Sequence, residues 1–274
     1  MSRRKPRRRS RRDGTPYRAW VFGALGLLLL VVFGGTGMYF RMTDRPVDRM
    51  TGCPEDGYDS ITVALIDLTD SINPVQAAAL RNALLKVRNE VPKFGRFEIY
   101  PLMPITTETI QPLFAGCSPG SGRDVDSRLY GNPELADRLW NRLYASKVDA
   151  VIAQISNLPP QDNSPILEGI QSVAVTAFGT LEAEKAMDRR IVLFSDMIHH
   201  TVDLSMYGGV PSFQDFKESQ YYRRVKPSLR GANVDVFLIV RETRRDAQQP
   251  PLYRFWVEQL ADGGGYLRYW EPLQ

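Results

Sequence analysis

Ser60-Ile-Thr-Val-Ala-Leu-Ile-Asp-Leu-Thr-Asp-Ser71 is the stretch of sequence that decides the fold. Its first seven residues are mostly apolar and β-branched, which is typical of a parallel strand buried on both faces. Asp67, Thr69 and Ser71 follow at alternate positions, and residues 74–87 begin with proline and carry an apolar stripe at helical spacing. The stretch therefore predicts a buried strand, a loop rich in oxygen ligands, and a helix.

Strand and helix patterns alternate through the rest of the chain. Strands are predicted at 60–66, 97–103, 190–194, 234–240 and 266–270, and helices at 74–87, 132–144, 165–186 and 251–260. Residues 148–155 fit either a helix or a strand, residues 104–132 are loop-rich, and residues 198–231 form an irregular or partly helical insert. This order predicts a doubly wound α/β fold, in which helices cover both faces of a mostly parallel sheet. Ligands bind such sheets at the carboxyl ends of their strands.

Further oxygen-bearing side chains stand at two other predicted strand ends or helix starts. Ser164 precedes the helix 165–186, and Asp196 follows the strand 190–194. Together with Asp67, Thr69 and Ser71 they form an oxygen-only set, which suits Mg²⁺ or Mn²⁺ better than zinc, with Ca²⁺ as a third option. The alternative is that Asp67 only caps the following helix. The adjacent His199 and His200 read as loop residues beside this site rather than as a second metal centre.

These motifs resemble the von Willebrand factor type A domain and its metal-ion-dependent adhesion site. The family pattern is D-x-S-x-S after the first strand, a threonine in a second loop, and an aspartate after a central strand, often in T-D-G. Here Asp67, Thr69 and Ser71 fit the first element, Ser164 stands for the threonine, and Asp196 for the last aspartate. The resemblance implies a metal whose open position is filled by a carboxylate from a partner protein. Ser195-Asp196-Met197 lacks the usual glycine.

The amino-terminal part of the chain differs sharply from the rest in charge. Residues 1–18 carry a net charge of +8, and because the whole chain carries +4, the remainder carries −4. Residues 19–40 contain no charged side chain, and a helix of that length spans about 33 Å, enough for a bilayer core. The expected organisation is a basic tail (1–18), a transmembrane helix (19–40), a stalk (41–57) and an α/β domain (58–274). The mildly acidic domain is not expected to bind nucleic acid.

The basic tail and the two cysteines indicate where the domain lies. The positive-inside rule places the tail in the cytoplasm and the domain outside, across a bacterial inner membrane. A nucleic-acid arm or an anionic-lipid patch are alternative interpretations of the tail, and a cleaved signal peptide is the alternative for the apolar run. Cys53 and Cys117 lie in turn-rich stretches on the outer side, where a disulfide can form.

The sequence thus predicts a membrane-tethered, divalent-metal-dependent module for adhesion or assembly, facing the periplasm or the exterior, with no catalytic residue assigned. Two alternatives remain open. One is a Mg²⁺-dependent hydrolase or phosphatase that uses Asp67, although an aspartyl phosphatase would want an acid where Thr69 stands. The other is a metal-free scaffold with the same fold.

Overall fold

The computed structural model divides into two compact units, Met1–Arg45 and Pro46–Gln274. The structure describes residues 17–43, 45–67, 69, 71–103, 110–125, 131–155 and 161–273. The basic tail predicted over residues 1–18 therefore falls almost entirely outside the described part of the chain.

The first unit contains one helix, α1 (Tyr17–Thr43), which covers the predicted apolar run. Large apolar side chains between Trp20 and Phe33 are exposed on it. Within the residues that the structure describes, no helix meets the length and apolarity that a membrane crossing requires.

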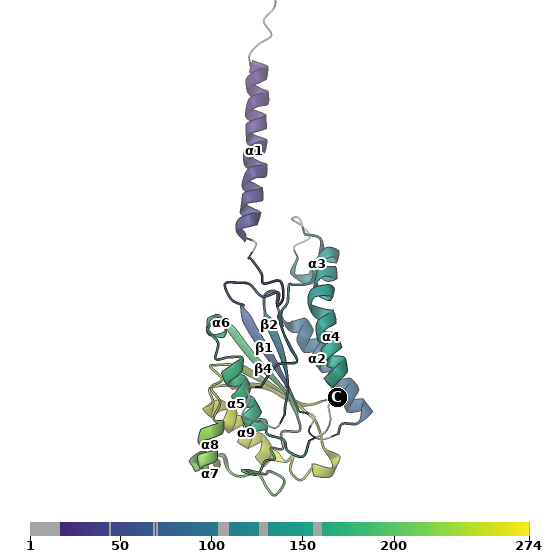
Figure 1. Ribbon diagram of the computed structural model, residues 1–274, viewed down its shortest axis with the longest axis vertical. Helices are drawn as coiled ribbons and strands as arrows, with labels where there is room; N and C mark the ends of the chain where they lie inside the picture. Colours follow the sequence, from purple (N-terminus) through teal and green to yellow (C-terminus); the bar gives the residue numbers. More distant parts are fainter. Residues whose placement is uncertain are drawn as a thin grey trace, which may run out of the picture. The chain divides into compact units, whose positions relative to one another are not determined.

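The second unit is built on one sheet of six strands, in the order β3-β2-β1-β4-β5-β6 (Figure 1). The strands are β1 (Ser60–Ile66), β2 (Arg96–Pro101), β3 (Phe114–Cys117), β4 (Asp188–Ser195), β5 (Asn233–Leu238) and β6 (Tyr266–Pro272). All neighbouring pairs are parallel except β2 and β3. The expected mostly parallel α/β sheet is confirmed.

The position of β1 in this order defines where a site can form. All seven residues of β1 are buried, as their apolar and β-branched composition predicts. The chain leaves β1 toward β2 on one side and later returns to β4 on its other side. The switch point of the doubly wound sheet therefore lies between the carboxyl ends of β1 and β4, where ligands of such folds bind.

Helices cover both faces of the sheet (Figure 1). In the second unit they are α2 (Pro74–Glu90), α3 (Pro133–Trp140), α4 (Ser146–Ile155), α5 (Ile166–Thr176), α6 (Leu181–Lys185), α7 (Phe213–Glu218), α8 (Gln220–Val225) and α9 (Pro250–Asp262). Helices α2 and α4 enclose one buried apolar cluster against the sheet, and α5, α8 and α9 enclose the larger one on the other face. A capping box between Asn73 and Gln76 starts α2 directly after the first loop.

The structure differs from the sequence-based elements at two places and settles a third that the sequence left undecided. Strand β3 lies inside the segment read as a loop, because four residues flanked by proline and glycine give too short a pattern to recognise. The helix predicted over 165–186 is two helices, α5 and α6, and the turn between them requires Gly179, because an added Cβ there would lie 2.3 Å from the Val175 carbonyl oxygen. The undecided segment 148–155 is helical, within α4.

A disulfide between Cys53 and Cys117 confirms the predicted pairing. It attaches the segment before the domain to the edge strand β3, and the Cys117 amide also donates to the Thr51 carbonyl at 2.8 Å. Closing a loop of 64 residues stabilises the fold by roughly 4 kcal/mol in the chain-entropy model. Residues 46–57 thus belong to the folded unit.

Candidate functional site

The candidate site is organised by the buried carboxylate of Asp67, the first residue after β1. The Asp67 amide donates to the Phe194 carbonyl at 2.8 Å, so the pairing of β1 with β4 continues into the site. Oδ1 accepts from the hydroxyl of Thr69 at 2.7 Å and from its amide at 3.1 Å. Oδ2 accepts from the hydroxyls of Ser164 at 3.0 Å and Ser195 at 2.7 Å. One carboxylate therefore joins three segments of the chain.

The structure brings four of the five predicted site residues together. Thr69 and Ser164 are buried and bind Asp67, as expected from their place at strand ends and helix starts. Asp196 is buried beside them. Burial and the nearby Asp67 carboxylate raise the pKa of Asp196 above its ordinary value. Ser71 is different, because it is exposed and takes part through its backbone carbonyl.

Two residues of the site were missed by the sequence analysis. Ser195, the last residue of β4, donates its hydroxyl to Asp67 and accepts from the Met197 amide at 2.8 Å. Arg241 follows β5 and forms a buried ion pair with Asp196, with Nε 2.9 Å from Oδ2. The rule that selected Asp67, a polar residue just beyond a buried strand, also selects Arg241, because Arg241 directly follows the strand predicted over 234–240.

The turn after β4 is held in an uncommon backbone conformation. Met197 has a φ of 62°, in the left-handed region that glycine favours. It stands where the family pattern T-D-G has its glycine. Its amide binds Ser195, and its carbonyl accepts from the Trp256 indole at 2.8 Å, so contacts on both sides hold the turn. This turn places Asp196, whose Oδ1 accepts from the Ile198 amide at 2.9 Å.

His199, a loop residue beside the site, is fully buried under this turn. Its Nε2 lies 2.9 Å from the Tyr221 hydroxyl oxygen, and the Tyr221 hydroxyl donates its proton to Glu168 at 2.6 Å. Burial lowers the pKa of His199 to about 3, and neighbouring His200 adds to the effect. The imidazole is therefore neutral at physiological pH, and it serves the packing of α5 and α8 against the site.

The residues present fit a divalent ion poorly. Both oxygens of Asp67 and both of Asp196 already accept hydrogen bonds, and a guanidinium supplies positive charge at Asp196. Binding of Mg²⁺, Mn²⁺ or Ca²⁺ stays a prediction of the sequence motif.

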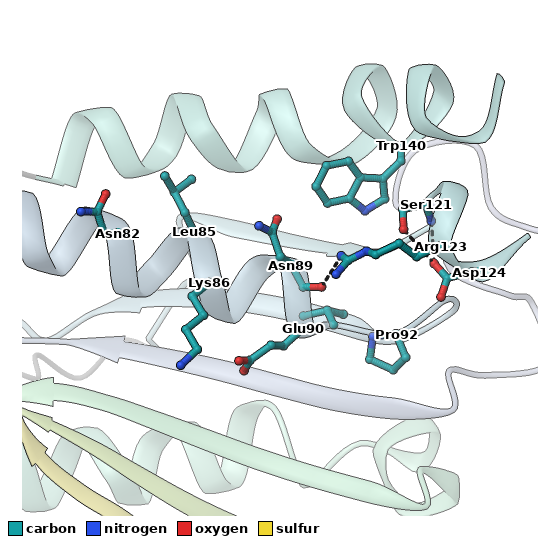
Figure 2. A pocket seen from close by; sticks show the side chains of 11 residues that line it. Asn82, Leu85, Lys86, Asn89, Glu90, Pro92, Ser121, Arg123, Asp124 and Trp140 are labelled. Atoms are coloured by element: carbon teal, nitrogen blue, oxygen red, sulfur yellow. Dashed lines mark hydrogen bonds between the residues drawn. The ribbon is translucent and has the colours of Figure 1, made fainter. Parts of the chain in front are cut away.

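A pocket of about 690 Å³ lies at the other end of the domain, where α2 ends and β2 begins. Figure 2 shows Lys86 and Arg123 on its walls together with Glu90 and Asp124. Arg123 donates to the Asn89 carbonyl at 3.0 Å. Charges of both signs line the pocket in equal number, so it favours no single class of ligand.

No protein-family model matches the chain, and no curated protein matches it. Among solved structures, the crystal structure of the SpRpn10 VWA domain is similar with a TM-score of 0.40 and 13% identity, covering 78% of this chain and 89% of that one. The D319A mutant of the PilB minor pilin from Streptococcus sanguinis gives 0.41 and 12%, covering 77% of this chain and 57% of that one. Likeness at this level assigns no family.

Replacing Asp67 with asparagine is expected to lower the free energy of unfolding by about 3 kcal/mol, because buried hydroxyls lose a charged acceptor. The matched control is Ser71→Ala, which removes an exposed hydroxyl from the same loop and should change stability by less than about 0.5 kcal/mol. Urea unfolding measures both. Equal losses in the two variants would show that the carboxylate does not organise the site.

His199 is expected to stay neutral between about pH 8 and pH 5. In a His200→Gln variant it is the only histidine, and its imidazole NMR signals should not shift over that range. Because the unfolded state takes up a proton near pH 6.5 and the folded state only near 3, His199 removes stability as the pH falls between these values, by up to about 1.4 kcal/mol per pH unit.

Asp196 has the opposite effect on stability, because its pKa is raised in the folded state. As the pH falls from neutral toward the ordinary pKa of an aspartate, the folded state takes up this proton before the unfolded state, and stability increases. The stability test therefore compares the parent chain with His199→Gln across that range. A smaller loss of stability in acid for His199→Gln is the expected result. Identical pH profiles, or an imidazole that titrates near pH 6.5, would contradict the assignment.

Proposed function

We propose that this chain is a membrane-tethered protein-interaction module whose binding face is the carboxyl edge of the sheet around Asp67. The observation that carries the proposal is the network at that carboxylate. It fixes the loop after β1, the start of α5 and the turn after β4 in one arrangement. Rigid, preformed loops at the switch point of a doubly wound sheet make a surface that a partner can recognise with little ordering cost.

The chemistry of the same groups favours binding over catalysis. The hydroxyls of Ser164 and Ser195 both donate to Asp67, and the buried His199 pairs with Tyr221. Neither of these two serine hydroxyls is paired with an imidazole base, and the Ser205 hydroxyl, which lies 2.9 Å from His200 Nδ1, belongs to an exposed pair outside this network. A hydrolase of the serine type requires that pairing. A Mg²⁺-dependent phosphatase would need the ion that the donor set fits poorly.

Exposed side chains surround the network and offer contacts to a partner. Asp162 and Asn163 precede the buried Ser164, and Val202 is 99% exposed in the loop after β4. The antiparallel bridge between Ser164 and His200 brings these two loops side by side. A polar rim with an exposed apolar side chain is a composition that protein interfaces use. The expected partner is therefore another protein.

The tether is proposed from the amino-terminal sequence. Twenty-two uncharged residues, 19–40, follow a tail of net charge +8, which favours a cytoplasmic amino terminus. The Cys53–Cys117 disulfide agrees with this orientation, because disulfides persist in oxidising compartments such as the periplasm. The domain would then face the periplasm or the exterior.

Site-specific photo-crosslinking in the native host tests the proposal. The photoreactive residue is placed at Asp162 or Val202 on the proposed face, and at Asn82 or Asn89 on the pocket of Figure 2 as matched exposed controls. Adducts of discrete mass should form from the first pair, disappear with Asp67→Asn, and sediment with membranes.

Adducts from the control positions alone would contradict the proposed face. Phosphate-ester turnover by the purified chain that requires Mg²⁺ and is abolished by Asp67→Asn would favour the enzyme alternative. Recovery of the full chain in the soluble fraction would contradict the tether.

A further inference from the structure

Arg241 stands where the sequence motif predicts a metal ion to act. Its side chain is 9% exposed and that of Asp196 is 3% exposed, so the ion pair between them is shielded from water. The guanidinium also donates through Nη1 to the Ser71 carbonyl at 2.7 Å. It therefore connects the turn after β4 with the loop after β1, which are the segments that carry the two predicted carboxylate ligands.

The backbone around Arg241 is fixed by the same segments. The Arg241 amide donates to the Gln248 side chain at 2.8 Å. The amide group of that side chain in turn donates to the carbonyls of Asp196 at 3.0 Å and Ile239 at 2.9 Å. From α2, Gln76 donates to the Val240 carbonyl at 2.8 Å. The guanidinium is thus held at a set position and is not a mobile surface charge.

We infer that the guanidinium of Arg241 is the resident cation of this site, so that the site assembles and presents its binding face without a divalent ion. A metal in this place would offset buried negative charge and draw two loops together. Arg241 pairs with the buried Asp196 carboxylate and, through the Ser71 carbonyl, joins the same two loops. An arginine guanidinium is always charged and suits buried pairs of this kind.

The hydrogen bonds that the two carboxylates already accept show why a divalent ion competes poorly with Arg241 for this site. Oδ2 of Asp196 accepts from Arg241, and Oδ1 accepts from the Ile198 amide. An ion near Asp67 would have to displace hydroxyl donors from that carboxylate or bind close to a fixed positive charge. This inference deepens the proposed function and rests on it only for the identity of the binding face.

Mn²⁺ binding and thermal unfolding of the full chain in detergent test the inference. The chain should not bind Mn²⁺ with a Kd below about 1 mM, the weak end of protein divalent sites, and its Tm should be the same in EDTA and in Mg²⁺. Arg241→Gln should lower Tm by about 6 °C or more, because it leaves Asp196 without its partner. Arg245→Gln is the matched control, since Arg245 lies on the same loop in an exposed pair with Glu242.

Micromolar Mn²⁺ binding by the parent chain that Asp196→Asn abolishes would overturn the inference, and so would equal Tm values for Arg241→Gln and Arg245→Gln. The Mn²⁺ measurement on the parent chain is decisive even where Arg241→Gln does not fold. The Mn²⁺ measurement requires no partner protein. A result that overturns the role of Arg241 is therefore distinguishable from a crosslinking result that contradicts the proposed binding face.

Discussion

The buried carboxylate of Asp67 is the constraint on which the rest of the site depends. A charged group with 2% exposure is costly unless its oxygens are satisfied, and here they accept from Thr69, Ser164 and Ser195. Those donors come from segments far apart in the sequence. The hydrogen bonds that this one side chain accepts therefore hold the loop after β1, the start of α5 and the turn after β4 together.

Charge balance around that carboxylate explains the remaining contacts. Asp196 is a second buried acid beside Asp67, and burial together with this neighbour raises its pKa. Arg241 offsets part of the excess negative charge and links the loops after β1, β4 and β5. Met197 takes a conformation that costs most side chains about 1 kcal/mol or more, and its contacts with Ser195 and Trp256 offset that strain. Such strain is typical of functional positions.

The predictability of the site from sequence follows from how local each signal is. Asp67, Thr69, Ser164 and Asp196 could be selected because each lies next to a strand or helix whose pattern is visible in the chain. Ser71 could not be separated from them, since exposure depends on how the loop turns. Ser195 and Arg241 directly follow the strands predicted at 190–194 and 234–240, but the carboxylate that each of them binds depends on the strand order, which the sequence pattern does not show. Strand β3 was missed because four residues at the edge of a sheet are too few to show a periodic pattern. The break at Gly179 was missed because the close approach of its backbone to the Val175 carbonyl is not visible in the apolar pattern.

Hydrogen exchange of the backbone amides in the parent chain and in Asp67→Asn tests the central claim most directly. If one carboxylate holds three segments, the variant should lose protection together at Thr69, at the bridge between Ser164 and His200, and at Met197, while β3 beside the Cys53–Cys117 disulfide is unchanged. Loss of protection at Thr69 alone would contradict the account, because it would show that the other two segments hold their places without Asp67.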